Sequence, residues 1–257
     1  MAKSKRLREI VMSLGVLALF LLGWEYVPPL FGLPHYIIAP ASDTWNEFLR
    51  MLVQEQLIKH TLITCATVLV GFALGSLLGM VGGYVLGMSP TTEVVLSPYI
   101  LALQIAPKVA FAPLFVIWFG YTVYPKILVA ILIVFFPVLV NVLTAIRTVD
   151  PDLINLARSF SASRWQIFRM IEFRVAMPPL FSGLRIGATL AVIGVTVGEL
   201  VGGNSGVGYL LTYGEGSGNT AMVFVAIIML TLIGILAYAL VVWAERRVLH
   251  YLPRGAA

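Results

Sequence analysis

The residues that could carry out chemistry are few, and their spacing argues against catalysis by this chain. Gly203-Asn204-Ser205-Gly206 matches the G-x-S-G pattern around the nucleophile of some intramembrane serine proteases. Such a serine needs a histidine base within hydrogen-bond reach. The histidines are expected at the ends of the apolar segments or outside them: His35, His60 and His250. We interpret the pattern as a glycine-rich turn and keep an intramembrane protease as a remote alternative.

Nucleotide and metal chemistry lack their usual residues as well. A phosphate-binding loop needs G-x-x-x-x-G-K-[ST], and no lysine follows a glycine in this chain: Lys3, Lys5, Lys59, Lys108 and Lys126. Three scattered histidines and one cysteine, Cys65, predict no metal site and no internal disulfide. We therefore expect a chain that is not an enzyme and binds no cofactor.

Three ionisable residues lie within or beside apolar segments, where such groups commonly serve function. Lys108 lies between two prolines, and we expect it to line a transport pathway or gate, unless its side chain reaches out to the headgroups. Glu199 lies beside the glycine-rich turn, where it either forms part of a gate or caps a re-entrant helix and pairs locally. Glu25 is expected at the membrane interface.

The elements that carry these residues must lie in lipid. Of the 257 residues, 60% are hydrophobic and 11% are charged, and the mean hydropathy is +0.96. Soluble domains carry roughly 25% charged residues, so a chain with this composition could not cover a water-facing surface. The composition excludes a soluble enzyme and a disordered protein.

Six apolar stretches are long enough to cross a membrane, since a crossing helix needs about 20 residues. We place them at about 9–27, 61–88, 95–119, 126–146, 178–201 and 220–244. The first could instead be a cleaved signal peptide. The residues at its end and just beyond, Trp24 to Pro29, offer no small-x-small cleavage site, so we expect a membrane helix.

The basic residues predict the orientation of these helices. Most of the 17 lysines and arginines fall in the N-terminal segment, in the loop from 147 to 185 and in the C-terminal segment. Because cytoplasmic loops are enriched in Lys and Arg, we expect both termini inside the cell. The net charge of +5 then needs no nucleic-acid partner.

The second apolar stretch has a glycine at every fourth position. Residues four apart share a helix face, so this stripe lets another backbone approach closely. The partner is either a helix of the same chain or a second copy of the chain. The stripe consists of Gly71, Gly75, Gly79, Gly83 and Gly87.

The one long polar stretch on the expected inner side, from Arg147 to Met177, predicts two short helices. Asp150-Pro151 suits a helix start, and apolar residues at 153, 154, 156, 157 and 160 form one face that should end near Ser161. Ser163 with Gln166 forms a capping box for the second helix. The apolar face either rests on lipid headgroups or docks a soluble partner.

The residues of this loop resemble the EAA loop of ABC importer permeases. The run extends from Asp150 to Ser163 and closes with Met177-Pro178 and Gly183-Leu184-Arg185. Pro107-Lys108, Trp118-Phe119-Gly120, Gly198-Glu199-Leu200 and Gly206-Val207-Gly208 are similar to further signatures of the branch that holds the taurine, alkanesulfonate and nitrate permeases. Asn155 and Leu156 replace the first two letters of EAA, Ser161 replaces a glycine, and Phe173-Arg174 replace a Leu-Pro pair.

The resemblance implies an all-α, polytopic membrane protein with six transmembrane helices and the type I ABC importer permease fold. It would form one permease domain over residues 1–257 in the inner (plasma) membrane. The residues implied to contact the ATPase are Asn155, Leu156, Ala157, Phe160 and Ser161.

The resemblance also implies the partners: ABC ATPase subunits that bind ATP and Mg²⁺, an external solute-binding protein, a second copy of the chain, and membrane lipid. The expected cargo is a small organic or inorganic anion such as a sulfonate or nitrate, with a vitamin or pyrimidine precursor as the alternative. A secondary transporter is the alternative class; such folds usually show internal repeats and midplane carboxylates.

Overall fold

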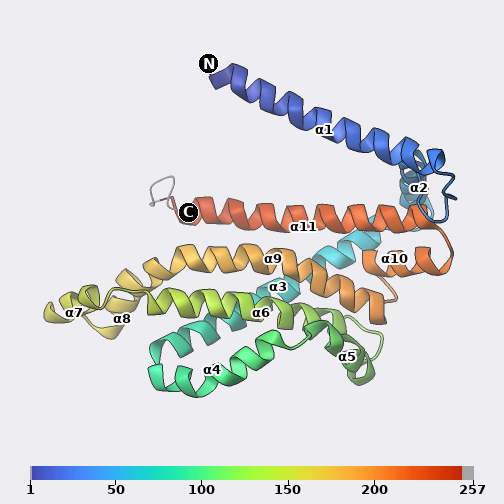
Figure 1. Cartoon of the computed structure of the whole chain (residues 1–257). Helices are drawn as coiled ribbons and strands as arrows, with labels where there is room; N and C mark the ends of the chain where they lie inside the picture. The colour runs from blue at the N-terminus through green and yellow to red at the C-terminus, as the bar shows by residue number, and fades with distance from the viewer. Residues whose placement is uncertain (1, 251–257) are drawn as a thin grey trace.

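Every regular element that the structure describes is a helix. The structure is a computed structural model that describes residues 2–250, with side chains from residue 8 onward (Figure 1). The long helices are α1 (Ala2–Leu30), α3 (Leu57–Met88), α6 (Tyr124–Arg147), α9 (Phe173–Gly202) and α11 (Thr220–Val248). The shorter elements are α2 (Ala41–Val53), α4 (Pro90–Ile105), η1 (Lys108–Phe111), α5 (Ala112–Phe119), α7 (Pro151–Ser159), α8 (Arg164–Ile167), η2 (Phe168–Glu172) and α10 (Val207–Gly216).

Five helices are long and apolar enough to span a membrane, and a sixth span results if the bent pair of α4 with η1 and α5 is counted. That pair bends by 80° between Ile105 and Lys108, where Pro107 lacks the N–H that a continuous helix would use. The six apolar stretches expected from the sequence each coincide with one of these segments. The helix that corresponds to the fifth predicted stretch is α9. It begins at Phe173 rather than near 178, so Pro178 and Pro179 lie inside it.

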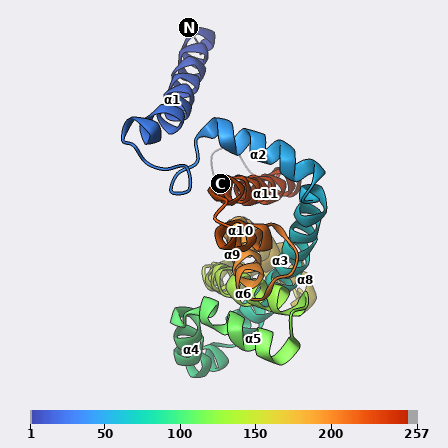
Figure 2. The ribbon, with the colours of Figure 1, turned by 90° about the vertical axis from the view of Figure 1, so that its right-hand side faces the viewer.

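The centre of the bundle is α6, which lies between α3 and α9 (Figure 2). The glycine stripe of α3 faces α6 of the same chain: a Cβ on Gly71 would lie 2.6 Å from the Cβ of Ala130. A Cβ on Gly194 of α9 would lie 2.7 Å from the Cα of Ala130. Ala130 is thus enclosed by glycines from both sides, which brings three backbones close together.

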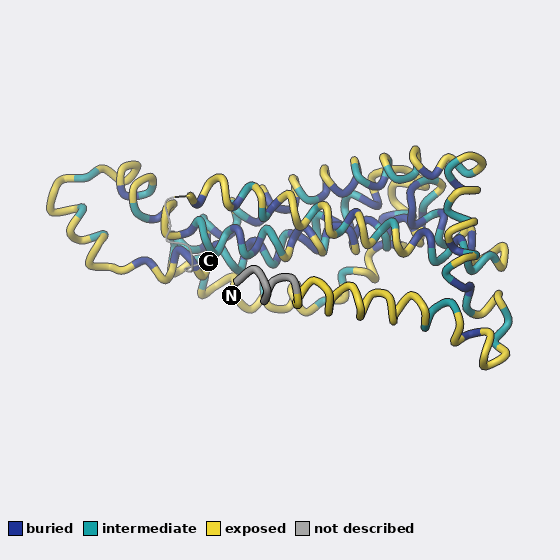
Figure 3. Tube along the Cα trace, turned by 90° about the horizontal axis from the view of Figure 1, so that it is seen from above, coloured by how far each residue is buried: buried dark blue, intermediate teal, exposed yellow. Residues whose placement is uncertain are grey.

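The elements divide between two ends of the bundle. Figure 1 shows α7 and α8 projecting at one end, together with the start of α1 and the end of α11, and α2 and α10 at the other. In Figure 2, α2 lies across its end of the bundle, between α1 and α3. The apolar stretch of α1 that could span the membrane is 0% buried, and Figure 3 shows this helix exposed from residue 8 to residue 22 and intermediate at residues 23–25.

Some of the basic residues that predict the orientation of the helices in the membrane lie outside the part of the chain that the structure describes. The side chains of Lys3, Lys5 and Arg6, and all of Arg254, lie outside the described residues.

Candidate functional site

The helix α7 begins at the position that its sequence predicts. The Asp150 carboxylate accepts the backbone N–H of Asp152 at 2.9 Å, and Pro151 occupies the first helical position. The carboxylate also lies where the helix dipole favours negative charge. This local capping confirms the helix start expected from Asp150-Pro151.

The end of α7 is closed by a left-handed residue. Ser161 has a φ of 55°, Ala162 N donates to Ala157 O at 3.1 Å, and Ser161 N donates to Arg158 O at 2.9 Å. These two bonds form a Schellman motif, in which the left-handed position favours glycine. The serine at 161 therefore stands at the strained position of the turn, which explains why the resembled loop has glycine there.

Between its caps, α7 exposes an apolar face. Leu153, Leu156 and Phe160 are 46%, 56% and 79% exposed, and their spacing puts them on one side of the helix. Ala157 is half-buried beside them, while Asn155 is exposed. A capped helix with an uncovered apolar face is typical of a docking surface.

The next elements anchor the loop to the bundle. The capping box is confirmed: Ser163 Oγ accepts the N–H of Gln166 at 3.3 Å, and Gln166 Oε1 accepts that of Ser163 at 2.7 Å. In η2, the ring of Phe168 lies 4.9 Å from that of Tyr84 on α3. This ring contact joins η2 to α3, and η2 continues directly into α9.

Two ion pairs brace the same end of the bundle. Arg147, at the end of α6, pairs with Glu93 at the start of α4. Arg185 Nε of α9 lies 3.5 Å from Glu245 Oε2 of α11, and Glu245 is 6% exposed. The first pair joins α6 to α4 and the second joins α9 to α11, so each helix that flanks the α7 loop is tied to a neighbouring helix.

The ammonium of Lys108 turns back onto its own chain. Its Nζ donates to Gln104 O at 2.6 Å and lies 4.9 Å from the centre of the Phe136 ring on α6. The break after α4 frees carbonyls at the helix end, where positive charge is favoured. Lys108 thus caps α4 at the bend.

The carboxylate of Glu199 lies inside a polar network at the α10 end. Glu199 is 0% exposed and accepts from Thr64 Oγ1 at 2.9 Å and from Gly208 N at 2.8 Å. Thr64 Oγ1 in turn accepts the N–H of Val207 at 2.8 Å. The network joins α3, α9 and the start of α10.

The G-x-S-G turn belongs to the same network. His60 lies beside it, but His60 Nδ1 accepts the N–H of Gly206 at 2.9 Å, so this nitrogen serves the backbone. Lys126 Nζ donates to Ser205 O at 2.7 Å. Both side chains hold the turn in place, and no described hydrogen bond joins His60 to the Ser205 hydroxyl.

Glu25 holds α1 to α2. Its carboxylate accepts from the backbone N and the hydroxyl of Ser42, at 2.9 and 2.8 Å, in the first turn of α2. The neighbouring Trp24 Nε1 donates to Ala39 O at 2.9 Å. This region is where the long helix α1 turns into α2.

Several contributors were missed in the sequence. Thr64 bonds Glu199, and His60 and Lys126 bond the adjacent glycine-rich turn, through contacts that are distant along the chain. A second stripe of small residues, on α9, could have been predicted from the sequence, because its glycines recur at helical spacing. In the structure each of them faces α6: Gly183, Gly187, Gly194 and Gly198.

Comparison with known proteins agrees with this arrangement. Residues 71–250 match the family described as the binding-protein-dependent transport system inner membrane component. A riboflavin transport system permease of Chloroflexus aurantiacus is 37% identical, over 91% of this chain and 88% of that protein. A formylaminopyrimidine transport permease of Halalkalibacterium halodurans is 32% identical, over 84% and 86%.

A permease named for aliphatic sulfonates, from Bacillus subtilis, is 34% identical over 79% of this chain and 74% of that protein. Permeases of this kind are multi-pass proteins of the plasma membrane and are not themselves enzymes. The chain therefore belongs to the inner membrane components of binding-protein-dependent transport systems, the permease subunits of ABC importers, in the branch that includes the aliphatic sulfonate and taurine permeases.

Proposed function

We propose that two copies of this chain pair around one pathway, with an ATPase bound to each α7 and a solute-binding protein docked at the opposite end. With both termini inside the cell, the six crossings put segments 28–60, 120–125 and 202–219 outside, and these segments gather at the end of the bundle opposite α7 (Figure 1). The start of α1 and the end of α11 lie toward α7 (Figure 1), in keeping with the proposed inside position of this end. Closure of the ATPases on ATP would then draw the two α7 loops together.

The observation that carries the ATPase contact is the uncovered face of α7. Leu153, Leu156 and Phe160 are exposed on a helix that is capped at both ends. The loop is anchored through η2, so its apolar face is held in place for a partner. We propose Asn155, Leu156, Ala157, Phe160 and Ser161 as the coupling residues.

Two glutamate substitutions on opposite faces of α7 test this contact. Ala157→Glu puts a charge on the apolar face, and burying it unpaired at an interface costs roughly 2–5 kcal/mol. We expect the tagged, full-length permease to insert normally and to lose its ATPase on purification. Ser159→Glu adds the same charge to the opposite face, at an exposed position outside the proposed coupling residues, so this control should retain the ATPase.

The contact is disproved if the Ala157→Glu permease retains its ATPase and transports as the wild type does. Loss of the ATPase from both variants would show that added charge alone weakens the complex.

Crosslinking in membranes tests the proposed pairing of two copies of this chain, and a strict monomer in the active complex would contradict it.

Lys108 and Glu199 would act on the pathway by positioning its parts. Lys108 closes the end of α4 at the bend, and Glu199 on α9 accepts hydrogen bonds from Thr64 on α3 and from Gly208 on α10. We propose that the bend and α10 are the elements that border the pathway, and that these two charges keep them in place.

The cargo that we propose is a small heterocyclic vitamin or pyrimidine precursor. The riboflavin and formylaminopyrimidine permeases match most of this chain, and Lys108 and Lys126 already donate to carbonyl oxygens of the chain. A sulfonate is the second candidate, because of the aliphatic sulfonate permease.

Calorimetry on the binding protein of the same transport system decides between these cargoes. We expect it to bind riboflavin or a formylaminopyrimidine and to drive their uptake into proteoliposomes that hold the complete importer. Binding and uptake of taurine or an alkanesulfonate alone would replace the proposed cargo with an anion.

A further inference from the structure

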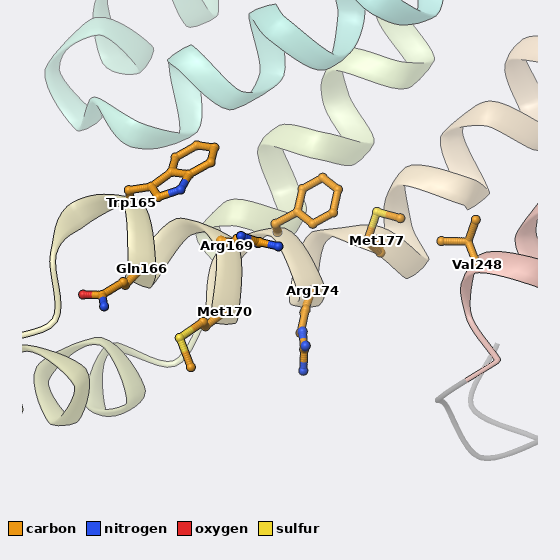
Figure 4. Close-up of a pocket in the computed structure, with 8 residues that line it drawn as sticks. Trp165, Gln166, Arg169, Met170, Arg174, Met177 and Val248 are labelled. Atoms are coloured by element: carbon orange, nitrogen blue, oxygen red, sulfur yellow. The ribbon is translucent and has the colours of Figure 1, made fainter.

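A groove of about 570 Å³ lies where the α8–η2 segment meets the ends of two long helices. Figure 4 shows its lining side chains, from Trp165 and Gln166 on α8 to Met177 on α9 and Val248 at the end of α11. The remaining lining residues are Arg169, Met170, Phe173 and Arg174.

The lining combines positive charge with exposed apolar surface. Arg169 and Arg174 are both exposed, and among the described residues no carboxylate lies within 4.0 Å of either guanidinium. Trp165 and Met170 are each 65% exposed. The groove therefore offers two unpaired cations beside an apolar wall.

We propose that this groove binds the headgroup of an anionic phospholipid. Guanidinium groups match the phosphate oxygens, and the apolar wall matches the glycerol and the first part of the acyl chains. Tryptophan and arginine together are typical of the membrane interface, and basic pockets between the ends of membrane helices bind anionic headgroups.

The position of the groove favours a lipid over a soluble partner. Met177 and Val248 belong to the ends of the spanning helices α9 and α11, so the groove lies at the level where lipid headgroups meet the protein. In contrast, α7 extends beyond this level (Figure 1). A lipid in the groove would contact the segment that joins α7 to α9, independently of the cargo.

Native mass spectrometry of the full-length chain in detergent tests the proposal. The probes are dioleoylphosphatidylglycerol, which is anionic, and dioleoylphosphatidylcholine, which has the same acyl chains and no net charge. We expect the wild type to retain phosphatidylglycerol preferentially. The double variant Arg169→Gln/Arg174→Gln should lose about 25-fold in affinity for it, at about five-fold for each arginine.

A matched control and a second pair of variants keep the test decisive. Arg158→Gln/Arg246→Gln removes the same charge from exposed positions outside the groove and should retain the lipid. Met170→Glu leaves both arginines in place but puts a negative charge beside them, and it should weaken phosphatidylglycerol binding more than Met170→Gln does.

Three results would overturn the proposal: equal retention of the two lipids by the wild type, wild-type lipid binding by Arg169→Gln/Arg174→Gln, or equal loss in the control. If the groove variant keeps its lipid and loses its ATPase on purification, the groove is a protein contact instead. Binding of free glycerol phosphate as tightly as of the lipid would assign the site to soluble phosphate.

Discussion

The hydroxyl of Thr64 donates to the carboxylate of Glu199 at 2.9 Å, and the two residues lie 135 positions apart in the sequence. The same oxygen accepts the N–H of Val207 at 2.8 Å. One small side chain on α3 therefore satisfies a buried carboxylate on α9 and a backbone donor at the start of α10. Inside a membrane protein such groups must find partners within the protein.

Removal of this hydroxyl should destabilise the chain. Thr64→Val keeps the shape of the side chain but leaves the N–H of Val207 unpaired and Glu199 with one donor fewer, at a cost of about 1–3 kcal/mol. We expect a lower melting temperature in detergent for the full-length protein. Thr67→Val is the matched control, because the Thr67 hydroxyl bonds only Ile63 O of its own helix, and it should cost clearly less.

The role of Glu199 can be separated into positioning and gating. Glu199→Gln removes the charge and one acceptor from the network, so we expect a lower melting temperature and a parallel fall in uptake. The measurement is uptake per folded importer in proteoliposomes. A variant with wild-type stability and strongly reduced uptake would show that the charge itself acts in the pathway.

The tight contact of α9 with α6 predicts a strong effect of a single methyl group. A Cβ at position 194 would lie 2.7 Å from the Cα of Ala130, so Gly194→Ala must push two backbones apart, at about 1–3 kcal/mol. In α11, a Cβ at position 234 would meet nothing within 4 Å. Gly234→Ala should therefore be tolerated, and thermal unfolding of the two variants compares them directly. Equal stability of both would contradict the proposed packing constraint.

The strained turn after α7 predicts a stabilising substitution. Ser161 has a φ of 55°, which costs a non-glycine residue about 1–2 kcal/mol, although glycine returns part of this as chain entropy. Ser161→Gly should therefore slow amide exchange at Ala162, whose N–H bonds Ala157 O. Ser161→Val should accelerate it. Faster exchange in the glycine variant would show that the serine is not strained.

The sequence predicted the features that depend on local chemistry. The start of α7 at Asp150 and the capping box of Ser163 with Gln166 involve hydrogen bonds within three residues, so their residue types reveal them directly. The apolar stretches likewise indicate helices in lipid, because length and composition suffice for that inference.

Features that depend on distant contacts could not be predicted in the same way. The pairing of Glu199 with Thr64 requires α3 and α9 to be placed first, and a glutamate beside a glycine-rich turn is equally compatible with a gate.

The 80° bend between Ile105 and Lys108 has a local cause in Pro107. Pro98, Pro137 and Pro178 lie inside helices, so a proline alone does not show where a helix will break.

Lys108 gives the last prediction, because its two contacts define a measurable coupling. Its ammonium donates to Gln104 O at 2.6 Å and lies 4.9 Å from the Phe136 ring centre. Lys108→Met should lose the helix-end bond and the cation–π contact, about 1–2 kcal/mol together. Phe136→Leu should lose the cation–π contact alone. The double variant should cost less than the sum of the single variants, because both single variants lose this contact.

The measurement is thermal unfolding of the wild type, the two single variants and the double variant, with Lys108→Arg as the charge-preserving control. Additive losses would show that the ammonium and the ring do not interact. A fall in uptake by Lys108→Met beyond its loss of folded protein would place the charge in the pathway itself.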